Sequence, residues 1–181
     1  MLKYATSLVG EILILLLFFV VSNNFLAERP NLIEADGRGY YEFLPATFIY
    51  EDLTLSYLDT LQTDFYDDQM IANVFYPRLE NGQRYDKYFL GTAILQAPFF
   101  GIGHAWARFS PTEKEDGFST PYQQSIFIGS LFYALCGLAF LRLLLKSFDV
   151  QNGWIWLLQI GTLFCGSLLN YVQWDAAYSH V

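Results

Sequence analysis

An acidic residue in an unusual setting follows the first apolar stretch of the chain, within Glu34-Ala-Asp36-Gly-Arg38-Gly-Tyr40-Tyr41. The glycines on either side of Arg38 permit unusual backbone angles, so the Asp36 carboxylate can be aimed back toward that stretch. Arg38 could hold Asp36 ionised or bind a phosphate. The same pattern is also typical of an Asx-turn in which Asp36 caps the following helix, and both interpretations stay open.

A second polar cluster, Tyr85-Asp86-Lys87-Tyr88-Phe89-Leu90-Gly91-Thr92, precedes another apolar stretch. Lys87 could meet a phosphate there, or it could act with its tyrosine neighbours only as an interfacial anchor. The segment from Gly117 to Gln123 is typical of a helix entry. For His104, inside an apolar stretch, an interhelical hydrogen bond is the plainer interpretation.

The composition excludes several classes of protein. Of the 181 residues 54% are hydrophobic and the formal net charge is -8, which argues against a phosphate-backbone binder and therefore against a nucleic-acid partner. The two cysteines lie in apolar runs, and the two histidines are too few and too isolated for a His-based zinc site. No nucleotide-binding loop, metalloprotease motif or nucleophile elbow is present.

Four apolar stretches approach the length that crosses a bilayer, which is roughly 20 helical residues. They cover residues 8–26, 89–107, 126–145 and 154–171. A single such stretch could be a buried core helix, but four in one short chain predict an all-α, polytopic membrane protein. The first could instead be a signal peptide, but it lacks a small-residue cleavage site, so an anchored helix is favoured.

Nearly all the net charge lies in residues 27–88, with twelve acidic and five basic side chains. Cytoplasmic loops usually carry excess Lys and Arg, and Lys3 precedes the first span, so we expect the N-terminus inside and this loop outside. Residues 40–58 are dense in aromatic and aliphatic side chains near helical spacing, which predicts short juxtamembrane helices. Residues 62–87 are rich in turn formers and are expected to be irregular.

The order of these features resembles the N-terminal part of GT-C-type glycosyltransferases, which include protein O-mannosyltransferases and the aminoarabinose transferases of lipid A. In these polytopic enzymes one spanning helix is followed by a large external loop that opens with an acid and an aromatic residue. Here Asp36 matches the acid, Tyr40 and Tyr41 match the aromatic residues, and Lys87-Tyr88-Phe89-Leu90-Gly91 matches the entry motif of the next helix. Uncharacterised bacterial membrane proteins with a D-x-x-GYY-x-x-LPA opening and an S-H-V element, here Ser179-His180-Val181, are also similar.

The resemblance implies transfer of a sugar from a polyprenyl phosphate, within the bilayer, to the hydroxyl of an unidentified acceptor on the external face of a bacterial inner membrane. It implies Asp36 as the general base. The residues expected to bind substrate or lipid phosphate are Glu34, Arg38, Tyr40, Tyr41, Arg84, Lys87, Tyr88 and His180.

The resemblance has two departures. Family members usually carry two adjacent acids, whereas Gly37 follows Asp36 here, so no cofactor is implied and a divalent metal stays an open alternative. Members also have more spanning helices, so we expect that 1–181 is a single membrane domain cut from a longer protein. The alternative function is a non-catalytic, four-helix membrane partner or assembly protein whose acidic loop contacts other proteins.

Overall fold

The structure is a computed structural model that describes residues 9–17, 19–20, 32–59, 76–165, 171 and 176–177. Within these ranges the regular elements are helical, which confirms the expected all-α fold, and the extended backbone is limited to one isolated bridge between Arg78 and Arg84. Residues 9–17 and 19–20 are helical. The remaining elements are α2 (Ala35–Phe48), η1 (Ser56–Asp59), α4 (Leu90–Phe109), α5 (Thr120–Ser147) and α6 (Asn152–Phe164).

The chain divides into two compact units. The first comprises residues 1–30, 127–176 and 180–181, and the second comprises residues 31–126 and 177–179. Helix α5 begins in the second unit and continues in the first. Each unit has its own packing and is described by itself.

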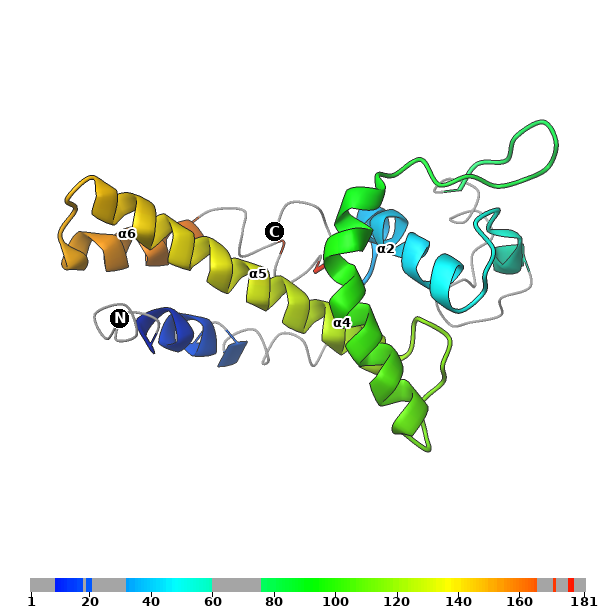
Figure 1. The fold of residues 1–181 in the computed structure, drawn as a ribbon, viewed down its shortest axis with the longest axis horizontal. Coiled ribbons are helices and arrows are strands. Elements are labelled where there is room, and N and C mark those ends of the chain that lie inside the picture. The colour runs from blue at the N-terminus through cyan, green and yellow to red at the C-terminus, as the bar shows by residue number, and fades with distance from the viewer. Residues whose placement is uncertain are drawn as a thin grey trace. The chain divides into compact units, whose positions relative to one another are not determined.

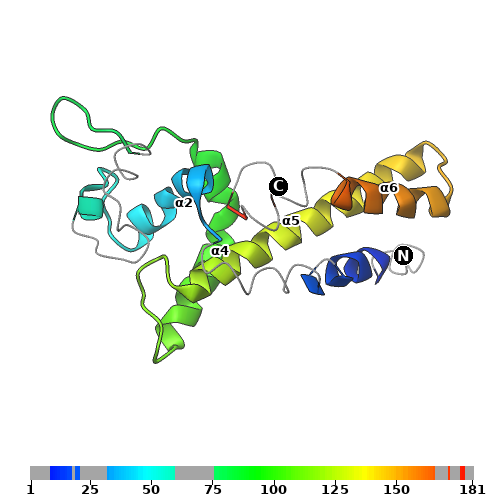
Figure 2. The same ribbon diagram turned by 180° about the vertical axis from the view of Figure 1, so that it is seen from behind.

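In the second unit, α2 packs against α4, and both views of the ribbon show these helices beside each other (Figure 1, Figure 2). Tyr41 and Leu44 of α2 and Phe100 of α4 are buried in the shared core. On α4 the buried positions recur every three or four residues, at Ala93, Gln96, Phe100, Gly103 and Ala107, so one side of this helix faces the core. A Cβ atom at Gly103 would approach the Tyr122 backbone to 2.9 Å, so only glycine permits this close contact.

Two tight turns complete the second unit. The segment at residues 78–84 forms a small hairpin whose turn residue, Gly82, has a positive φ of 84°. The irregular backbone expected for residues 76–87 is therefore confirmed, while residues 60–75 lie outside the described part of the chain. Before α5, the Asp116 carboxylate accepts hydrogen bonds from the backbone N–H groups of Phe118 and Ser119, both 2.8 Å, so this segment is the helix entry that its sequence predicts.

The first unit has polar groups inside and apolar groups outside. Arg142 of α5 forms an ion pair with Glu11 at 3.2 Å, and Gln159 of α6 donates to the other oxygen of Glu11 at 2.7 Å. All three side chains are buried. Around them, large exposed apolar side chains cover the helices: Val9, Leu13, Leu16, Leu17, Val20, Phe132, Phe140, Leu144, Trp154 and Leu157.

Within the described residues, α5 is the one helix long and apolar enough to cross a membrane. Its 28 residues correspond to roughly 42 Å, which exceeds the hydrocarbon thickness of about 30 Å. Helix α4 has 20 residues, but Gln96, Pro98 and His104 interrupt its apolar character and it does not meet the same criterion. The four crossings predicted from the sequence are therefore not established by the fold.

Candidate functional site

Tyr88 brings together the two polar clusters that stand out in the sequence. Its hydroxyl donates a hydrogen bond to Oδ1 of Asp36, 52 residues earlier in the chain. The Tyr88 ring lies against the backbone of Gly39, where any Cβ atom would overlap it. It also packs edge-on against Tyr40, with the ring centroids 5.0 Å apart. We call Asp36, Gly39, Tyr40, Lys87 and Tyr88 the Asp36–Tyr88 cluster.

Helix α2 positions the acidic side of this cluster. Glu34 is the N-cap residue, with extended backbone angles and no hydrogen bond from its side chain to the helix, and Asp36 lies in the first turn. The alternative in which Asp36 itself caps the helix is therefore wrong. Asp36 remains exposed in the first turn of the helix.

A cation lies on the other side of the cluster. The Lys87 ammonium is 5.3 Å from the centre of the Tyr88 ring, within cation–π range, and its side chain is exposed. Tyr88 thus contacts a carboxylate through its hydroxyl and an ammonium through its ring face. The exposed carboxylate of Asp36 and the exposed ammonium of Lys87 both contact Tyr88. The carboxylate can accept a hydrogen bond from a hydroxyl of a ligand while the ammonium contacts an anionic group of the same ligand.

Several predicted site residues are engaged in the interior of the second unit instead. Arg84 is 3% exposed, pairs with Asp59 at 2.8 Å and donates to the Tyr76 carbonyl at 3.0 Å. Arg38 is also buried. Tyr41 is fully buried and donates to the Gly117 carbonyl, and burial, with Tyr122 nearby, raises the pKa of its hydroxyl well above the usual value. These three side chains support the unit from within.

Glu42 and Asp86 form an acidic pair beside the cluster, and neither was among the expected catalytic or substrate-binding residues. Glu42 is completely buried and accepts hydrogen bonds from the hydroxyls of Tyr57 and Tyr76. Burial raises the pKa of Asp86 to about 7, the backbone hydrogen bond from Tyr88 opposes this rise, and the charge of Glu42 adds to it. The flanking tyrosines of Asp86 were the available signal, because aromatic neighbours desolvate a carboxylate.

The remaining candidates lie elsewhere or outside the described ranges. His104 of α4 bonds through Nδ1 to the Tyr122 hydroxyl of α5 at 2.6 Å, which is the interhelical hydrogen bond expected for it. His180 lies outside the described residues. Among the residues that the structure describes, no three His, Cys, Asp or Glu side chains are grouped so as to hold a metal ion.

Comparison with protein families, with curated proteins and with solved structures found no match to this chain. The resemblance to GT-C-type enzymes therefore continues to rest on the short motifs around Asp36 and Tyr88. The class of site that the geometry defines is an exposed carboxylate and an exposed ammonium held by a common tyrosine.

Proposed function

We propose that this chain belongs to a membrane glycosyltransferase that uses a polyprenyl-phosphate sugar. The observation that carries the proposal is the meeting of Asp36 and Tyr88, because it unites the first-loop acid and the later entry motif in one cluster. These two segments are the ones on which the resemblance to GT-C-type enzymes depends. Their contact across 52 residues supports a common role.

The membrane part of the proposal is supported by the inverted polarity of the first unit. Glu11 and Arg142 are 2% and 6% exposed, while Leu13, Leu17 and Val20 are each more than half exposed. Water would favour the opposite arrangement, whereas hydrocarbon favours polar groups that pair inside a helical bundle. A lipid bilayer is the partner that such a surface fits.

The chemistry uses the two exposed charges of the cluster. Asp36 accepts the proton of an acceptor hydroxyl while that oxygen bonds to the anomeric carbon of the sugar. The bond from the anomeric carbon to the phosphate oxygen breaks with its electron pair, and polyprenyl phosphate leaves. Lys87 stabilises the negative charge on the departing phosphate. Tyr88 orients Asp36 through its hydroxyl, and Tyr40 offers a ring against which a sugar can stack.

The test measures polyprenyl phosphate released by membranes that contain the full protein, with a panel of polyprenyl-phosphate hexoses and pentoses as donors. Asp36→Asn should lower release by about 100-fold or more, because positioned general-base catalysis contributes that much. Glu80→Gln is the matched control, since Glu80 is an exposed carboxylate of the same unit outside the cluster. Equal release by the parent and Asp36→Asn would remove Asp36 from the chemistry. Parent membranes that release nothing from any donor would favour the non-catalytic membrane partner instead.

A further inference from the structure

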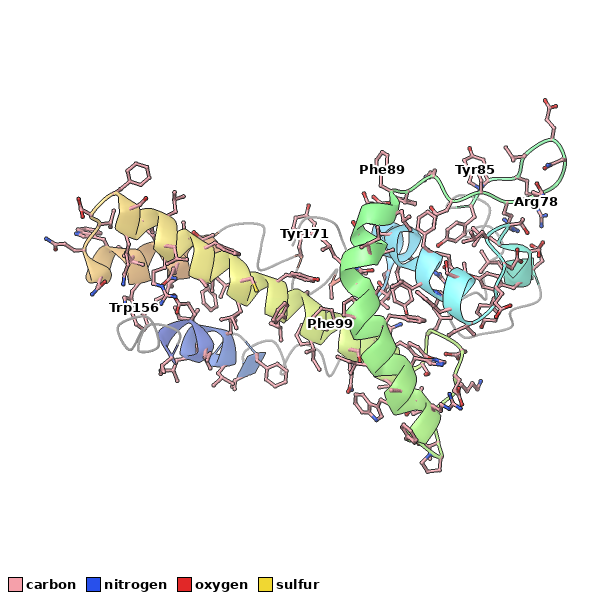
Figure 3. All side chains as sticks on the ribbon, viewed as in Figure 1. Arg78, Tyr85, Phe89, Phe99, Trp156 and Tyr171 are labelled. Atoms are coloured by element: carbon pink, nitrogen blue, oxygen red, sulfur yellow. The ribbon has the colours of Figure 1, made fainter. Side chains whose placement is uncertain are left out.

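Helix α4 has an apolar face that the described residues of the second unit leave exposed. Its opposite side packs against the core, but the outer face exposes Leu90, Ile94, Ile102, Trp106 and Phe109, with exposed fractions from 46% to 86%. Phe89, immediately before the helix, is 80% exposed and projects from the ribbon (Figure 3). One charge, Arg108, lies near the end of this helix, and Lys87 precedes its start. Such a surface requires an apolar partner.

The packing of the first unit restricts what that partner can be. Glu11 contacts Arg142 near the end of α5, and Phe19 packs on Phe127 near its beginning, with centroids 6.3 Å apart. The helical residues 9–17 and 19–20 therefore run in the direction opposite to α5. If both cross the bilayer, the chain between them must return to the side on which it emerged. A single crossing by α4 would place the start of α5 on the side of the bilayer opposite to the end of the first crossing.

A contact within the second unit argues independently against a crossing of the bilayer by α4. Gln96, in the second turn of α4, donates to the Ala177 carbonyl at 2.9 Å. Gln159 of α6 donates to the Leu138 carbonyl of α5 at 2.9 Å, so the chain turns back after α5. With three crossings, Ala177 returns to the side of residues 27–88, where α4 begins. With four crossings, Ala177 would be on the opposite side from the start of α4.

We propose that α4 lies along the external surface of the bilayer, with its face of Leu90, Ile94, Ile102, Trp106 and Phe109 inserted among the lipids. This inference rests on the membrane part of the proposed function. Interfacial helices bury an apolar face by about 5–10 Å and favour Trp and Phe on that face, as here. The bilayer is then crossed by three segments, at residues 8–26, 126–145 and 154–171, in place of the four that the sequence predicts.

The basic residues do not distinguish the two topologies. With three crossings, Arg142 and Lys146 lie toward the cytoplasmic side and Arg108 and Lys114 lie outside, whereas four crossings reverse both pairs. Lys3 stays cytoplasmic and the acidic loop stays outside in both arrangements. The cluster around Asp36 and Tyr88 would be held at lipid head-group level by a helix that lies in the surface, next to where a lipid-linked phosphate emerges.

The first measurement uses single cysteines at Glu80, Lys114 and Gln151 in a background with Cys136→Ala and Cys165→Ala, all within the full chain. Cells are treated with a membrane-impermeant maleimide before and after the membrane is opened. We expect Glu80→Cys and Lys114→Cys to label alike in intact cells, and Gln151→Cys to label only after opening. Labelling of Gln151→Cys but not Lys114→Cys in intact cells would mean that α4 crosses the membrane and would overturn the inference. Labelling of all three in intact cells, with the protein outside the membrane fraction, would instead refute the proposed membrane function.

The second measurement tests whether lipid covers the face. Spin labels at Ile94 and Ile102 are compared by collision with a lipid-soluble and a water-soluble relaxant. Phe132, an exposed position near the middle of the 126–145 span in α5, provides the deep reference. A helix lying in the surface gives both labels a similar shallow depth, whereas a crossing helix separates them by about 12 Å. Labels that meet neither relaxant would indicate that another protein covers the face, and this outcome would also reject the bilayer as its partner.

Discussion

The buried ion pair between Glu11 and Arg142 permits a quantitative test of how the first unit is held together. The carboxylate and guanidinium are 3.2 Å apart and their side chains are 2% and 7% exposed. Coulomb's law at an effective dielectric constant of 20 gives an attraction of about 5 kcal/mol at this separation. Removing one partner also leaves the other charge buried and uncompensated, which typically costs about 3–5 kcal/mol.

We therefore expect Glu11→Gln and Arg142→Met each to lower the free energy of unfolding by about 3–5 kcal/mol. The double variant should cost only about 1–2 kcal/mol, because no buried charge remains and the introduced glutamine side chain can still meet the amide of Gln159. The coupling free energy of the cycle should then be about 4 kcal/mol or more. Gln151→Met, an exposed position between α5 and α6, is the control and should change little.

Tryptophan fluorescence in detergent micelles titrated with sodium dodecyl sulfate gives the required unfolding curves. Trp156 is a suitable reporter, since its ring lies against the backbone of Gly10, and Figure 3 shows it between α6 and the helical residues 9–17. Separation of these helices should change its emission. A coupling free energy below about 1 kcal/mol, the range of exposed pairs, would refute the reasoning, because it would mean that the pair is solvated.

Three further predictions concern the second unit. Burial raises the pKa of Asp86 from its ordinary value of 3.8 to about 7, so the folded state binds more protons between these values and stability falls as pH rises from about 4 to about 7. Asp86→Asn should abolish this fall and be about 2 kcal/mol more stable than the parent at pH 8, which is half of the full shift because the group is half-buried. Identical pH profiles of thermal unfolding for the parent and Asp86→Asn would contradict this. Gly39→Ala should cost about 1–3 kcal/mol in the same thermal assay because its Cβ overlaps the Tyr88 ring, whereas Gly91→Ala, with open space around it, should be neutral or stabilising. Gln123→Leu removes the side-chain carbonyl that accepts hydrogen bonds from the N–H groups of Leu32 and Ile33, both at 2.9 Å. The free energy of unfolding should fall by about 2–4 kcal/mol and amide exchange at both residues should become faster, and exchange as slow as in the parent protein would count against this role.

The sequence predicts the elements of this protein better than it predicts their surroundings. Helix α2 and the turn before α5 follow from local residue patterns, because turn chemistry and helical spacing act over a few residues. The contact of Asp36 with Tyr88 is different. Its two members are 52 residues apart, so spacing alone gives no reason for them to meet.

Arginines show why the rest of the candidate site could not be predicted. Arg38, Arg84 and Lys87 are equivalent in sequence as cations near the motifs, yet only Lys87 is exposed. Arg84 is buried because Asp59 and the Tyr76 carbonyl satisfy its donors, and both are brought to it by the folded loop. Apolar stretch length is similarly ambiguous: α4 and α5 are both long, but Gln96, Pro98 and His104 lower the hydropathy of α4, so α5 alone remains a candidate span among the described helices.

The hydrogen bonds of Gln123 also have a consequence for synthesis. Its side-chain carbonyl holds the backbone at Leu32 and Ile33, 90 or 91 residues earlier, and Tyr41 depends likewise on the Gly117 carbonyl. A ribosome adds about 5–20 residues per second, so roughly 5–20 s pass between the emergence of the two ends of this contact. During that interval the aromatic face of α2 has been made but its partners have not. The nascent loop therefore needs temporary cover, which the membrane surface or a chaperone can supply until α5 begins to emerge.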